Sequence, residues 1–403
     1  MLSDEEMFDF LMDLVRIDTN AKTRKNYEEI VDVIRKKVEE LGFKYYVHEY
    51  RDEKGPLPSI LAWPDVEAES NLILLSHYDV VPAKGPWELN GRSFDPFDPI
   101  RVNGRIYGRG AADDKSAIAL SLSVLDKVRE AYSTGKKLRY LPIMAVVGDE
   151  EVGGKGVFVL AEDGFKDAGI RPDNVIVIDA APSFIGVGAS GVLHGWIKVK
   201  GISGHAGRPF LSRNPVHAAI LIGHDLLTSF SAHMASKISS IPSPPGSPVS
   251  KLWGRFSITI MEGGDKHNVI PDEAKLGFDV RFIPDDSKER IEEELRAFVT
   301  NLAVKHGVDV EVEFEKTINP GWMTDPESSL VKEALNSYEK YFGSRRVAAS
   351  LGGNDGFVFA NKGIPTISLG TIEEESRAHS SLENVREEIV KKVRDTIVDM
   401  IIL

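Results

Sequence analysis

The sequence predicts an α/β protein with a mostly parallel sheet, helices on both faces of the sheet, and a second domain of the α+β class inserted into the first. Three observations predict this fold. Apolar runs of strand length alternate with amphipathic helical segments in the first half of the chain, as in parallel sheets with crossover helices. In the middle, the pattern changes to β-α-β-β-α-β, and afterwards the first pattern resumes. At 403 residues, the chain is also long enough for two domains.

The first domain is predicted to begin with two amphipathic helices, Asp4–Arg16 and Asn26–Leu41. Asn26 is a suitable N-cap for the second helix, and Gly42 is a suitable C-terminal stop. Strands then follow, interrupted by an irregular loop over Pro86–Asn103 and by a helix over Lys115–Ala131. The predicted strands are Lys44–His48, Ser59–Trp63, Leu72–Ser76, Arg105–Tyr107, Leu138–Val147 and Asn174–Ile178.

The inserted domain is predicted over residues 191–315, so that the first domain comprises residues 1–190 and 316–403. Its composition includes a Pro- and Ser-rich loop at Ser239–Ser250. Its elements have the order of a split βαβ, ferredoxin-like domain. They are strand Val192–Lys200, helix Asn214–Phe230, strands Arg255–Glu262 and Ala274–Phe282, helix Ser287–His306 and strand Val308–Phe314. The first domain then resumes with a helix from about Asp325, strand Thr366–Leu369 and a final helix from about Val385.

Composition excludes several classes of partner and site. The net charge of -13 argues against nucleic acid and against an anionic membrane surface as partners. No apolar run is long enough to cross a bilayer, and the acidic start has no basic region of a signal peptide, which predicts a cytoplasmic protein. The chain has no cysteine, so any metal ion must be held by His, Asp and Glu.

The segment Asn71–Pro82 joins a buried strand to a polar turn. His77 and Asp79 lie at the end of the apolar run, two residues apart, so in extended chain their side chains face the same way. A histidine beside a carboxylate suits a metal ligand whose other ring nitrogen is oriented by that carboxylate. Taken alone, such a short segment is more often a surface histidine beside a turn aspartate.

Similar polar residues follow apolar strands along the rest of the chain. They are His77, Asp79, Asp113, Glu150, Glu151, Asp179 and His379. Because the carboxyl ends of the strands in an open α/β sheet meet at one edge, we expect these side chains to converge. Two histidines and several carboxylates suit zinc or a similar divalent ion, and they are too many for one ion with an open position. The set suits two ions that share a carboxylate at a separation of about 3.5–4 Å.

The neighbours Glu150 and Glu151 allow a division of roles. At a strand end their side chains would point in opposite directions, so one can bind an ion while the other acts as a general base on a water between the ions. An isolated acidic turn without function is the common alternative.

Several longer motifs occur in one order along the chain: SHYDVVP, GRGAADDKSA, GDEEVGGKG, IDAAPS, GISGHAGRP, GGDKHNVIPDEAKLGFDVR, GGNDGFVFANKGIPTISLG and AHSS. With them the chain resembles the co-catalytic dizinc metallopeptidase and deacylase family from about His77 to Glu383. That family includes acetylornithine deacetylase, succinyl-diaminopimelate desuccinylase, aminoacylase and glutamate carboxypeptidase.

The resemblance implies a role for each matching residue. Asp113 corresponds to the bridging ligand, with His77 and Asp179 completing one ion and Glu151 and His379 completing the other. Glu150 corresponds to the general base, and Asp79 to the residue that orients His77. His205 corresponds to a lid histidine that, in dimeric members, reaches the partner subunit's site. The residues implied to contact substrate are Asn268, Arg281, Gly352, Gly353 and Asn354.

The chain departs from the family pattern at several positions. Asp114 stands where Met is frequent, Ser116 where Gly is frequent, and Ser381 where Pro is usual. Asp179 resembles the peptidase branches, because deacylases and desuccinylases often carry Glu there. Phe357 replaces an arginine of the desuccinylase pattern. These departures do not affect the metal ligands, but they leave the identity of the substrate undecided.

Together, the residues and the resemblance predict a metal-dependent amidohydrolase. Its substrates would be small N-acyl amino acids or short peptides with a free carboxylate, as in a deacylase or desuccinylase, or in a carboxypeptidase or dipeptidase. The cofactors would be two divalent ions, zinc first, with cobalt or manganese as alternatives. The resemblance further implies a homodimer formed through the lid domain. The alternative from another class is a catalytically silent protein that binds metal or amino acids on the same scaffold.

Overall fold

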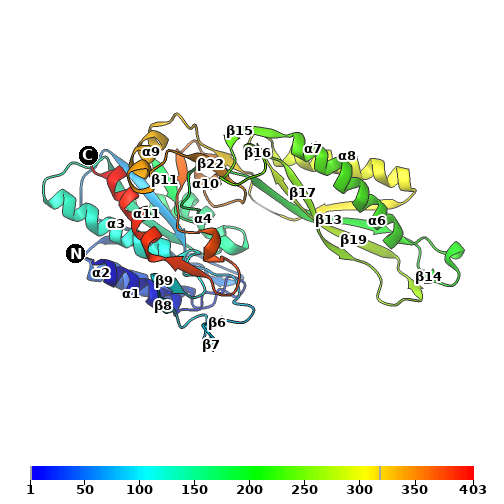
Figure 1. Ribbon diagram of the computed structural model, residues 1–403, viewed down its shortest axis with the longest axis horizontal. Helices are drawn as coiled ribbons and strands as arrows, with labels where there is room; N and C mark the ends of the chain where they lie inside the picture. The colour runs from blue at the N-terminus through cyan, green and yellow to red at the C-terminus, as the bar shows by residue number, and fades with distance from the viewer. Residues whose placement is uncertain (1, 317–318) are drawn as a thin grey trace. The chain divides into compact units, whose positions relative to one another are not determined.

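The computed structural model describes residues 2–316 and 319–403 and divides into two compact units (Figure 1). The first unit comprises Met1–Val187, Met323–Ala348 and Asn354–Leu403. The second unit comprises Gly188–Trp322 and Ala349–Gly353. Residues 317 and 318, which the sequence-based prediction assigns to the first domain, lie outside the described residues.

The first unit is built on a nine-stranded sheet in the order β1-β4-β10-β5-β11-β23-β12-β21, with β22 paired to β12. The central strands β10, β5, β11 and β23 are parallel, whereas β1, β4 and β12 are antiparallel to their neighbours. The strands are β1 Lys44–His48, β4 Ser59–Trp63, β5 Ser70–His77, β10 Tyr140–Val147, β11 Asn174–Val177, β12 Ile185–Ala189, β21 Trp322–Met323, β22 Val347–Ser350 and β23 Thr366–Ser368. The predicted α/β class with a largely parallel sheet is confirmed.

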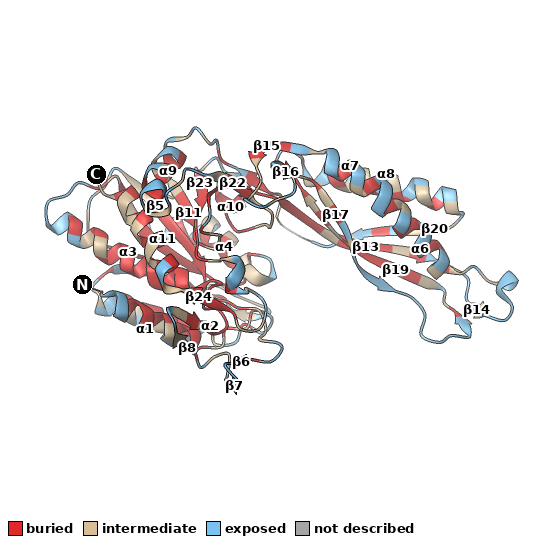
Figure 2. Ribbon diagram, in the orientation of Figure 1, coloured by how far each residue is buried: buried red, intermediate tan, exposed pale blue. Residues whose placement is uncertain are grey.

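The central strands are buried on both sides of the sheet. Leu72, Ile73, Leu74 and Leu75 of β5 are at most 1% exposed, as expected of a parallel strand covered by helices. Helices α1, α3, α11 and α9 pack in succession, and both α3 and α11 lie against β10. Figure 2 shows the buried faces of these elements. The helices of this unit are α1 Asp4–Val15, α2 Tyr27–Glu40, α3 Lys115–Ser133, α4 Lys155–Val159, α5 Phe165–Asp167, α9 Ser329–Phe342, α10 Phe357–Ala360 and α11 Glu387–Ile401.

The second unit has a four-stranded antiparallel sheet in the order β17-β19-β13-β20. Its helices cover one face of this sheet, and the core between them is apolar, with residues such as Leu193, Phe230 and Phe278 almost fully buried. The elements are β13 Gly191–Lys200, β14 Gly204–His205, α6 Pro215–Asp225, α7 Ser231–Ser236, β15 Ile238–Pro242, β16 Lys251–Trp253, β17 Arg255–Glu262, β18 Val269–Ile270, β19 Glu273–Phe282, α8 Lys288–His306 and β20 Asp309–Phe314.

One predicted helix start is wrong. The helix expected from about Asp325 begins at Ser329, because the Asp325 side chain accepts a hydrogen bond from the Glu327 N–H at 2.9 Å and closes a turn instead. The final helix, expected from about Val385, begins at Glu387, and the sequence did not predict that Asn384–Arg386 forms strand β24 against β9.

Two predicted loops contain regular structure. The Pro- and Ser-rich stretch is flanked by β15, which overlaps its start, and by β16, and these two strands form a hairpin. The loop before residue 103 contains a second hairpin and a strand that pairs with β9. The small strands of the first unit are β2 Arg51–Asp52, β3 Gly55–Pro56, β6 Glu88–Leu89, β7 Arg92–Ser93, β8 Ile100–Val102, β9 Arg105–Tyr107 and β24 Asn384–Arg386. Among the helices of the described residues, none has both the length and the apolar character that crossing a bilayer requires.

Candidate metal centre

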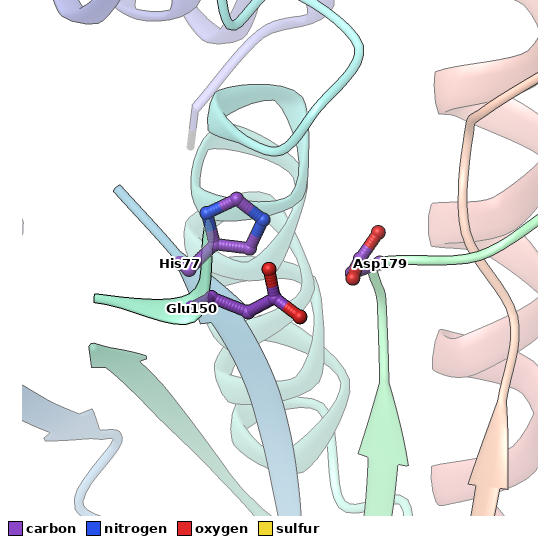
Figure 3. A group of neighbouring side chains, drawn as sticks. All are labelled: His77, Glu150 and Asp179. Atoms are coloured by element: carbon purple, nitrogen blue, oxygen red, sulfur yellow. The ribbon is translucent and has the colours of Figure 1, made fainter. Parts of the chain in front are cut away.

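The candidate site forms where three neighbouring parallel strands of the first unit end. In the sheet, β5 lies between β10 and β11. His77 is the last residue of β5, Glu150 follows the end of β10, and Asp179 follows the end of β11. Figure 3 shows the His77, Glu150 and Asp179 side chains pointing into the same space at this edge of the sheet. The carboxyl edge of an open α/β sheet is the usual ligand site of such a fold.

Two groups of side chains could each hold a metal ion. Within each group, the candidate ligand atoms lie within 4.8 Å of one another. The first group is His77, Glu150 and Asp179, and the second is Asp113, Glu151 and His379. All six are imidazoles or carboxylates, which are ligands for zinc and similar divalent ions.

Asp113 connects the two groups through its two carboxylate oxygens. Its Oδ1 lies 3.1 Å from His77 Nε2, and its Oδ2 lies 3.1 Å from His379 Nε2. The same His379 nitrogen is 3.1 Å from Glu151 Oε2. Two ligand atoms on one tetrahedral ion, each about 2.0 Å from it, are roughly 3.3 Å apart. The spacing of these atoms therefore fits two ions that share the Asp113 carboxylate.

The charge balance of the cluster also fits cations. Burial, together with the charge of the neighbouring Asp113 carboxylate, raises the pKa of Asp179 to about 7. Burial likewise raises the pKa values of Glu150 and Glu151, and for Glu150 the charges of Asp355 and Asp179 add to the effect. Glu151 Oε1 is buried and has no hydrogen-bond partner among the described residues. Divalent ions would remove this mutual repulsion.

The two histidines compensate the negative charge of the buried Asp113 carboxylate. Burial alone would raise its pKa, but hydrogen bonds and charge from His379 and His77 outweigh burial, so its pKa is lowered. In turn, the pKa of His379 is raised to about 10, first by Asp113 and then by Glu151. Without metal, the imidazole protons therefore occupy the place that a metal ion would take.

Asp79 is fully buried and holds the ends of two strands together. His77 Nδ1 lies 3.1 Å from the Asp79 carbonyl oxygen and 3.4 Å from Oδ1, so an N–H at Nδ1 leaves Nε2 free to face Asp113. The Glu150 N–H donates to Asp79 Oδ1 at 3.2 Å, and the Glu151 N–H donates to Oδ2 at 3.1 Å. Asp79 thus contacts both His77, mainly through its backbone carbonyl, and the acidic turn, through its carboxylate.

The acidic turn has a different geometry from the predicted one. Glu150 and Glu151 begin a short 3-10 helix, Glu150–Val152, and do not continue strand β10. Successive side chains on such a helix diverge by about a third of a turn, so the two carboxylates still point to different groups. The expected separation of the two side chains is present, but the extended backbone predicted to cause it is not.

A second network behind this turn was not apparent from the sequence. Asp149 adopts a left-handed conformation, with φ of 64°, and its buried carboxylate accepts hydrogen bonds from Arg24 Nε and Nη2 at 2.6–3.1 Å. Tyr27 donates a further hydrogen bond at 3.1 Å. Arg24 also pairs with Asp52, 2.6 Å from Nη1. Arg24 is 125 residues away from Asp149, so no local pattern could have indicated the contact.

Another buried ion pair joins the loops that carry Asp113 and His379. Arg109 pairs with Glu383, and both side chains are at most 1% exposed. Glu383 Oε1 accepts the Ala112 and Asp113 N–H groups at 3.0 and 3.1 Å. Arg109 Nη2 donates to the Ser380 carbonyl, next to His379, at 3.1 Å. Arg109 lies inside the GRGAADDKSA motif and Glu383 lies two residues after AHSS, and this closeness to the motifs is the signal that could have identified them.

The remaining predicted site residues, apart from Asn354, belong to the second unit. His205 is exposed, pairs with Val269 between β14 and β18, and accepts the Gly207 N–H on Nδ1 at 3.0 Å. Asn268 is exposed, and its carbonyl accepts the Ala206 N–H at 2.9 Å. Arg281 makes three hydrogen bonds of 2.9–3.1 Å to Asp279.

Three predicted residues occupy the segment where the chain returns to the first unit. The Gly352 N–H donates to Ser350 Oγ at 3.2 Å. Gly353 lies under Asn319, whose Nδ2 would be 1.9 Å from a Cβ at this position. Asn354 belongs to the first unit, is buried, and accepts the Gly356 N–H on Oδ1 at 3.1 Å.

Comparison with known proteins gives consistent results. The family model described as "Peptidase family M20/M25/M40" matches residues 73–402. A protein described as an uncharacterized metallohydrolase from Methanocaldococcus jannaschii is 26% identical over 96% of this chain and 97% of its own length. Succinyl-diaminopimelate desuccinylase from Xylella fastidiosa is 29% identical over 75% of each chain. The crystal structure of an M20 family metallo-carboxypeptidase from Sulfolobus solfataricus aligns with a TM-score of 0.77 at 20% identity over 98% of both chains, a likeness that establishes the fold.

Proposed function

The chain belongs to peptidase family M20/M25/M40, and from that premise we propose that it is a two-metal amidohydrolase of small N-acyl amino acids or short peptides. Family membership makes it a metallohydrolase that acts on peptides or N-acyl amino acids. The proposal adds the number of ions, the residues that hold them and the chemical step.

The observation that carries the proposal is the position of Asp113 between two histidines. Its two oxygens each lie 3.1 Å from a different histidine Nε2. We assign Asp113 as the shared ligand, His77 and Asp179 as further ligands of one ion, and Glu151 and His379 as further ligands of the other. Imidazole and carboxylate donors without thiolates fit zinc, and cobalt and manganese accept the same donors.

Bound at these residues, the ions would lower the pKa of water and polarise the scissile carbonyl. Glu150 is the only member of the two groups that this assignment does not use as a ligand. Its carboxylate accepts the proton of the attacking water and then returns that proton to the leaving amine. Burial raises the pKa of Glu150, which favours a group that both accepts and donates a proton. The hydrogen bond from the Glu150 backbone N–H to Asp79 holds the backbone of Glu150 at this edge of the sheet.

Glu150 could instead be read as a ligand, because it lies within 4.8 Å of His77 and Asp179. The role of base is favoured by the contact between His77 and Asp113, which supplies the first ion with a third ligand without Glu150. Metal analysis of the Glu150→Gln variant separates the two roles, because only a ligand should cost the protein an ion when it is replaced.

The proposed substrates carry a free carboxylate next to the scissile amide. The residues proposed to contact the substrate are Asn268, Arg281, Gly352, Gly353 and Asn354. A substrate screen decides whether the protein is a deacylase or desuccinylase, or a carboxypeptidase or dipeptidase. Purified protein loaded with zinc or cobalt is tested against N-acetyl and N-succinyl amino acids and against dipeptides. Metal-dependent hydrolysis of one class supports the proposal. A fully loaded protein that binds these compounds and hydrolyses none would instead be a silent binding protein.

We also propose a homodimer in which His205 acts in the partner's active site. The exposed position of His205, with Nδ1 held by a backbone N–H, leaves Nε2 free to donate to a developing oxyanion. Glu150→Gln chains and His205→Ala chains are each expected to be inactive. Mixed, they should regain activity, because one hybrid site receives both an intact base and an intact histidine. Verified heterodimers without activity, or a fully active monomer, would exclude this arrangement.

A further inference from the structure

The acidic turn at the end of β10 is held by a buried arginine from a distant segment. Arg24 lies between α1 and α2, is 5% exposed, and uses every N–H group of its guanidinium. Nε and Nη2 donate to the Asp149 carboxylate at 2.6–3.1 Å. Nη1 and Nη2 donate to the Asp52 carboxylate at 2.6 and 3.0 Å, and Nη1 also donates to the Gly55 carbonyl at 2.9 Å. Arg24 therefore has no donor left for a ligand, and its contacts join the turn to the β2–β3 hairpin.

The backbone of Asp149 is in the left-handed region, with φ of 64°. Non-glycine residues adopt this region rarely, and mostly where surrounding contacts stabilise it. In this conformation the Asp149 carbonyl accepts the N–H groups of Gly154 at 2.7 Å and of Val152 at 3.3 Å, which closes the turn. Because Glu150 and Glu151 follow directly, the conformation of Asp149 decides where their carboxylates point.

The far end of the turn is tied to the same hairpin. Lys155, which begins α4 directly after the turn, pairs with Asp52. Because Asp52 also pairs with Arg24, one carboxylate connects the two ends of the turn. Between these ends lie Gly153 and Gly154, with φ of 115° and 70°, which have no side chains of their own to fix the backbone. The conformation of the turn therefore depends on the contacts at its two ends.

We propose that Arg24 is a positioning residue that acts on the metal centre through Asp149. By fixing the turn, it holds the Glu151 carboxylate at its ion and the Glu150 carboxylate beside the attacking water. This inference rests on the proposed function, which assigns those two roles. It adds a residue whose hydrogen bonds go to the turn and the hairpin and not to a ligand of either ion. All of these residues belong to the first unit.

The two ions should respond differently to a change at Arg24. One ion has Glu151 as a ligand, and Glu151 belongs to the turn. The other ion has His77 and Asp179, which lie at the ends of β5 and β11 and not on the turn. A weaker contact at Arg24 should therefore lower the affinity for the first ion and leave the affinity for the second unchanged. A general loss of structure would lower both.

Zinc binding by the full chain tests this inference without relying on hydrolysis. Metal-free protein is titrated calorimetrically with zinc. Arg24→Lys keeps the charge but loses the planar fork, so it cannot bridge Asp149 and Asp52 as the arginine does. We expect a roughly 10-fold lower zinc affinity at Glu151 and His379, the lower end of the effect of residues that orient metal ligands. In the His379→Ala background, where only the other ion binds, Arg24→Lys should leave the affinity unchanged.

The position of Glu150 has its own measurement. At saturating zinc, Arg24→Lys should lower kcat by about 10- to 100-fold and leave KM nearly unchanged, because the base shifts while the substrate contacts stay in place. A kcat equal to that of the parent protein would refute the part of the inference that concerns Glu150.

Arg394 provides a matched control for the substitution of a buried arginine. It belongs to the same unit, is 3% exposed, and pairs with Asp4 and, at 2.9 Å, with Asp395. Arg394→Lys should lower Tm, as Arg24→Lys should, because both substitutions weaken a buried ion pair. Only Arg24→Lys should also lower the zinc affinity.

A double-mutant cycle tests whether Arg24 acts through Asp149. Asp149→Asn retains a residue that tolerates the left-handed region but removes the charge. Alone, it should cause a loss of zinc affinity similar to that of Arg24→Lys, so the test holds also if Arg24→Lys does not fold. Combined, the two substitutions should lower the affinity little more than either one does.

The possible outcomes separate a failure of this inference from a failure of the proposed function. Equal zinc affinities of Arg24→Lys and Arg394→Lys would refute the inference, and so would an equal loss in the His379→Ala background or losses that add in the cycle. The expected pattern of zinc affinities in a protein that hydrolyses no amide would refute the proposed function and leave the positioning of Glu151 standing. Hydrolysis by a parent protein whose Arg24 and Asp149 variants keep its zinc affinity would refute the inference alone.

Discussion

The two proposed metal positions of the first unit are built in different ways. The position formed by His77 and Asp179, here called the inner position, lies at the ends of adjacent strands, and the His77 side chain is 2% exposed. The position formed by Glu151 and His379, here called the outer position, depends on a loop, and the His379 side chain is 57% exposed. The backbone of His379 is also left-handed, with φ of 63°. The sheet therefore preorganises one position, whereas the other depends on the contacts of its loop.

The largest expected effect separates chemistry from metal binding at the inner position. Glu150→Gln retains the size and hydrogen bonds of Glu150 but cannot accept the proton of water. We expect kcat to fall by about 10²–10⁴-fold with both ions retained. Glu151→Gln should behave in the opposite way and lose metal at the outer position. Turnover rates and metal content of the two variants are measured together; normal turnover in Glu150→Gln would assign the base to another group.

Loss of either histidine should remove one ion and should affect folding unequally. His77→Ala and His379→Ala are each expected to lower the metal content from two ions per chain towards one. Only His77→Ala should also lower Tm clearly, because it leaves a cavity in a buried region, whereas His379 is largely exposed. Metal analysis after desalting and thermal melts check both statements. An unchanged metal content in both variants would contradict the ligand assignment.

The ion pair between Arg109 and Glu383 gives a smaller test of the outer position. Glu383→Gln retains an acceptor for the Asp113 N–H but loses the charge that pairs with Arg109. Because this pair anchors the loop beside His379, zinc affinity at the outer position should fall by about 10- to 100-fold. Glu388→Gln is the control, since Glu388 is exposed and pairs with Lys392 on the surface of α11. Equal zinc affinities of the two variants would show that the pair does not position the loop.

The smallest expected effect is a difference in the order of metal loss. A chelator should remove the outer ion faster than the inner one, since the outer position is more exposed. Acid should promote this loss, because without metal the pKa of His379 is about 10 and a proton competes for its Nε2 below that pH. Metal release in two phases, with the faster phase accelerating from pH 8 to pH 6, is the expected result. Metal release in a single phase that does not depend on pH would show that the inner and outer positions do not differ in how they hold their ions.

The inner position was the easier one to predict from sequence, for a physical reason. Its residues follow directly from strand ends, and parallel strands place their carboxyl ends at one edge. His379 was also expected to follow a strand, but it lies on a loop well beyond Ser368, the last residue of β23, so the strand-end argument applies to it only weakly. The contact of Arg24 with Asp149 and that of Arg109 with Glu383 join segments separated by 125 and 274 residues. A single sequence contains no local signal for such pairs.

Errors in the predicted fold have a similar cause. The helix start at Asp325 was expected from a pattern that suits both an N-cap and a turn, and the turn formed. The strand at Asn384–Arg386 exists because β9 supplies its partner, which no local preference can indicate. The long buried runs, such as β5 and β10, were predicted to within about two residues at each end, because burial on both faces demands apolar side chains throughout.

The shared carboxylate of Asp113 has a consequence for how the ions would bind together. A carboxylate that faces His77 with one oxygen and His379 with the other is oriented by whichever ion arrives first. The second ion then meets a side chain whose rotational freedom is already lost, so its binding costs less entropy. By thermodynamic linkage, each ion raises the affinity of the other by the same factor. The dinuclear centre would thus fill cooperatively, and intermediate states with one ion would be scarce at equilibrium.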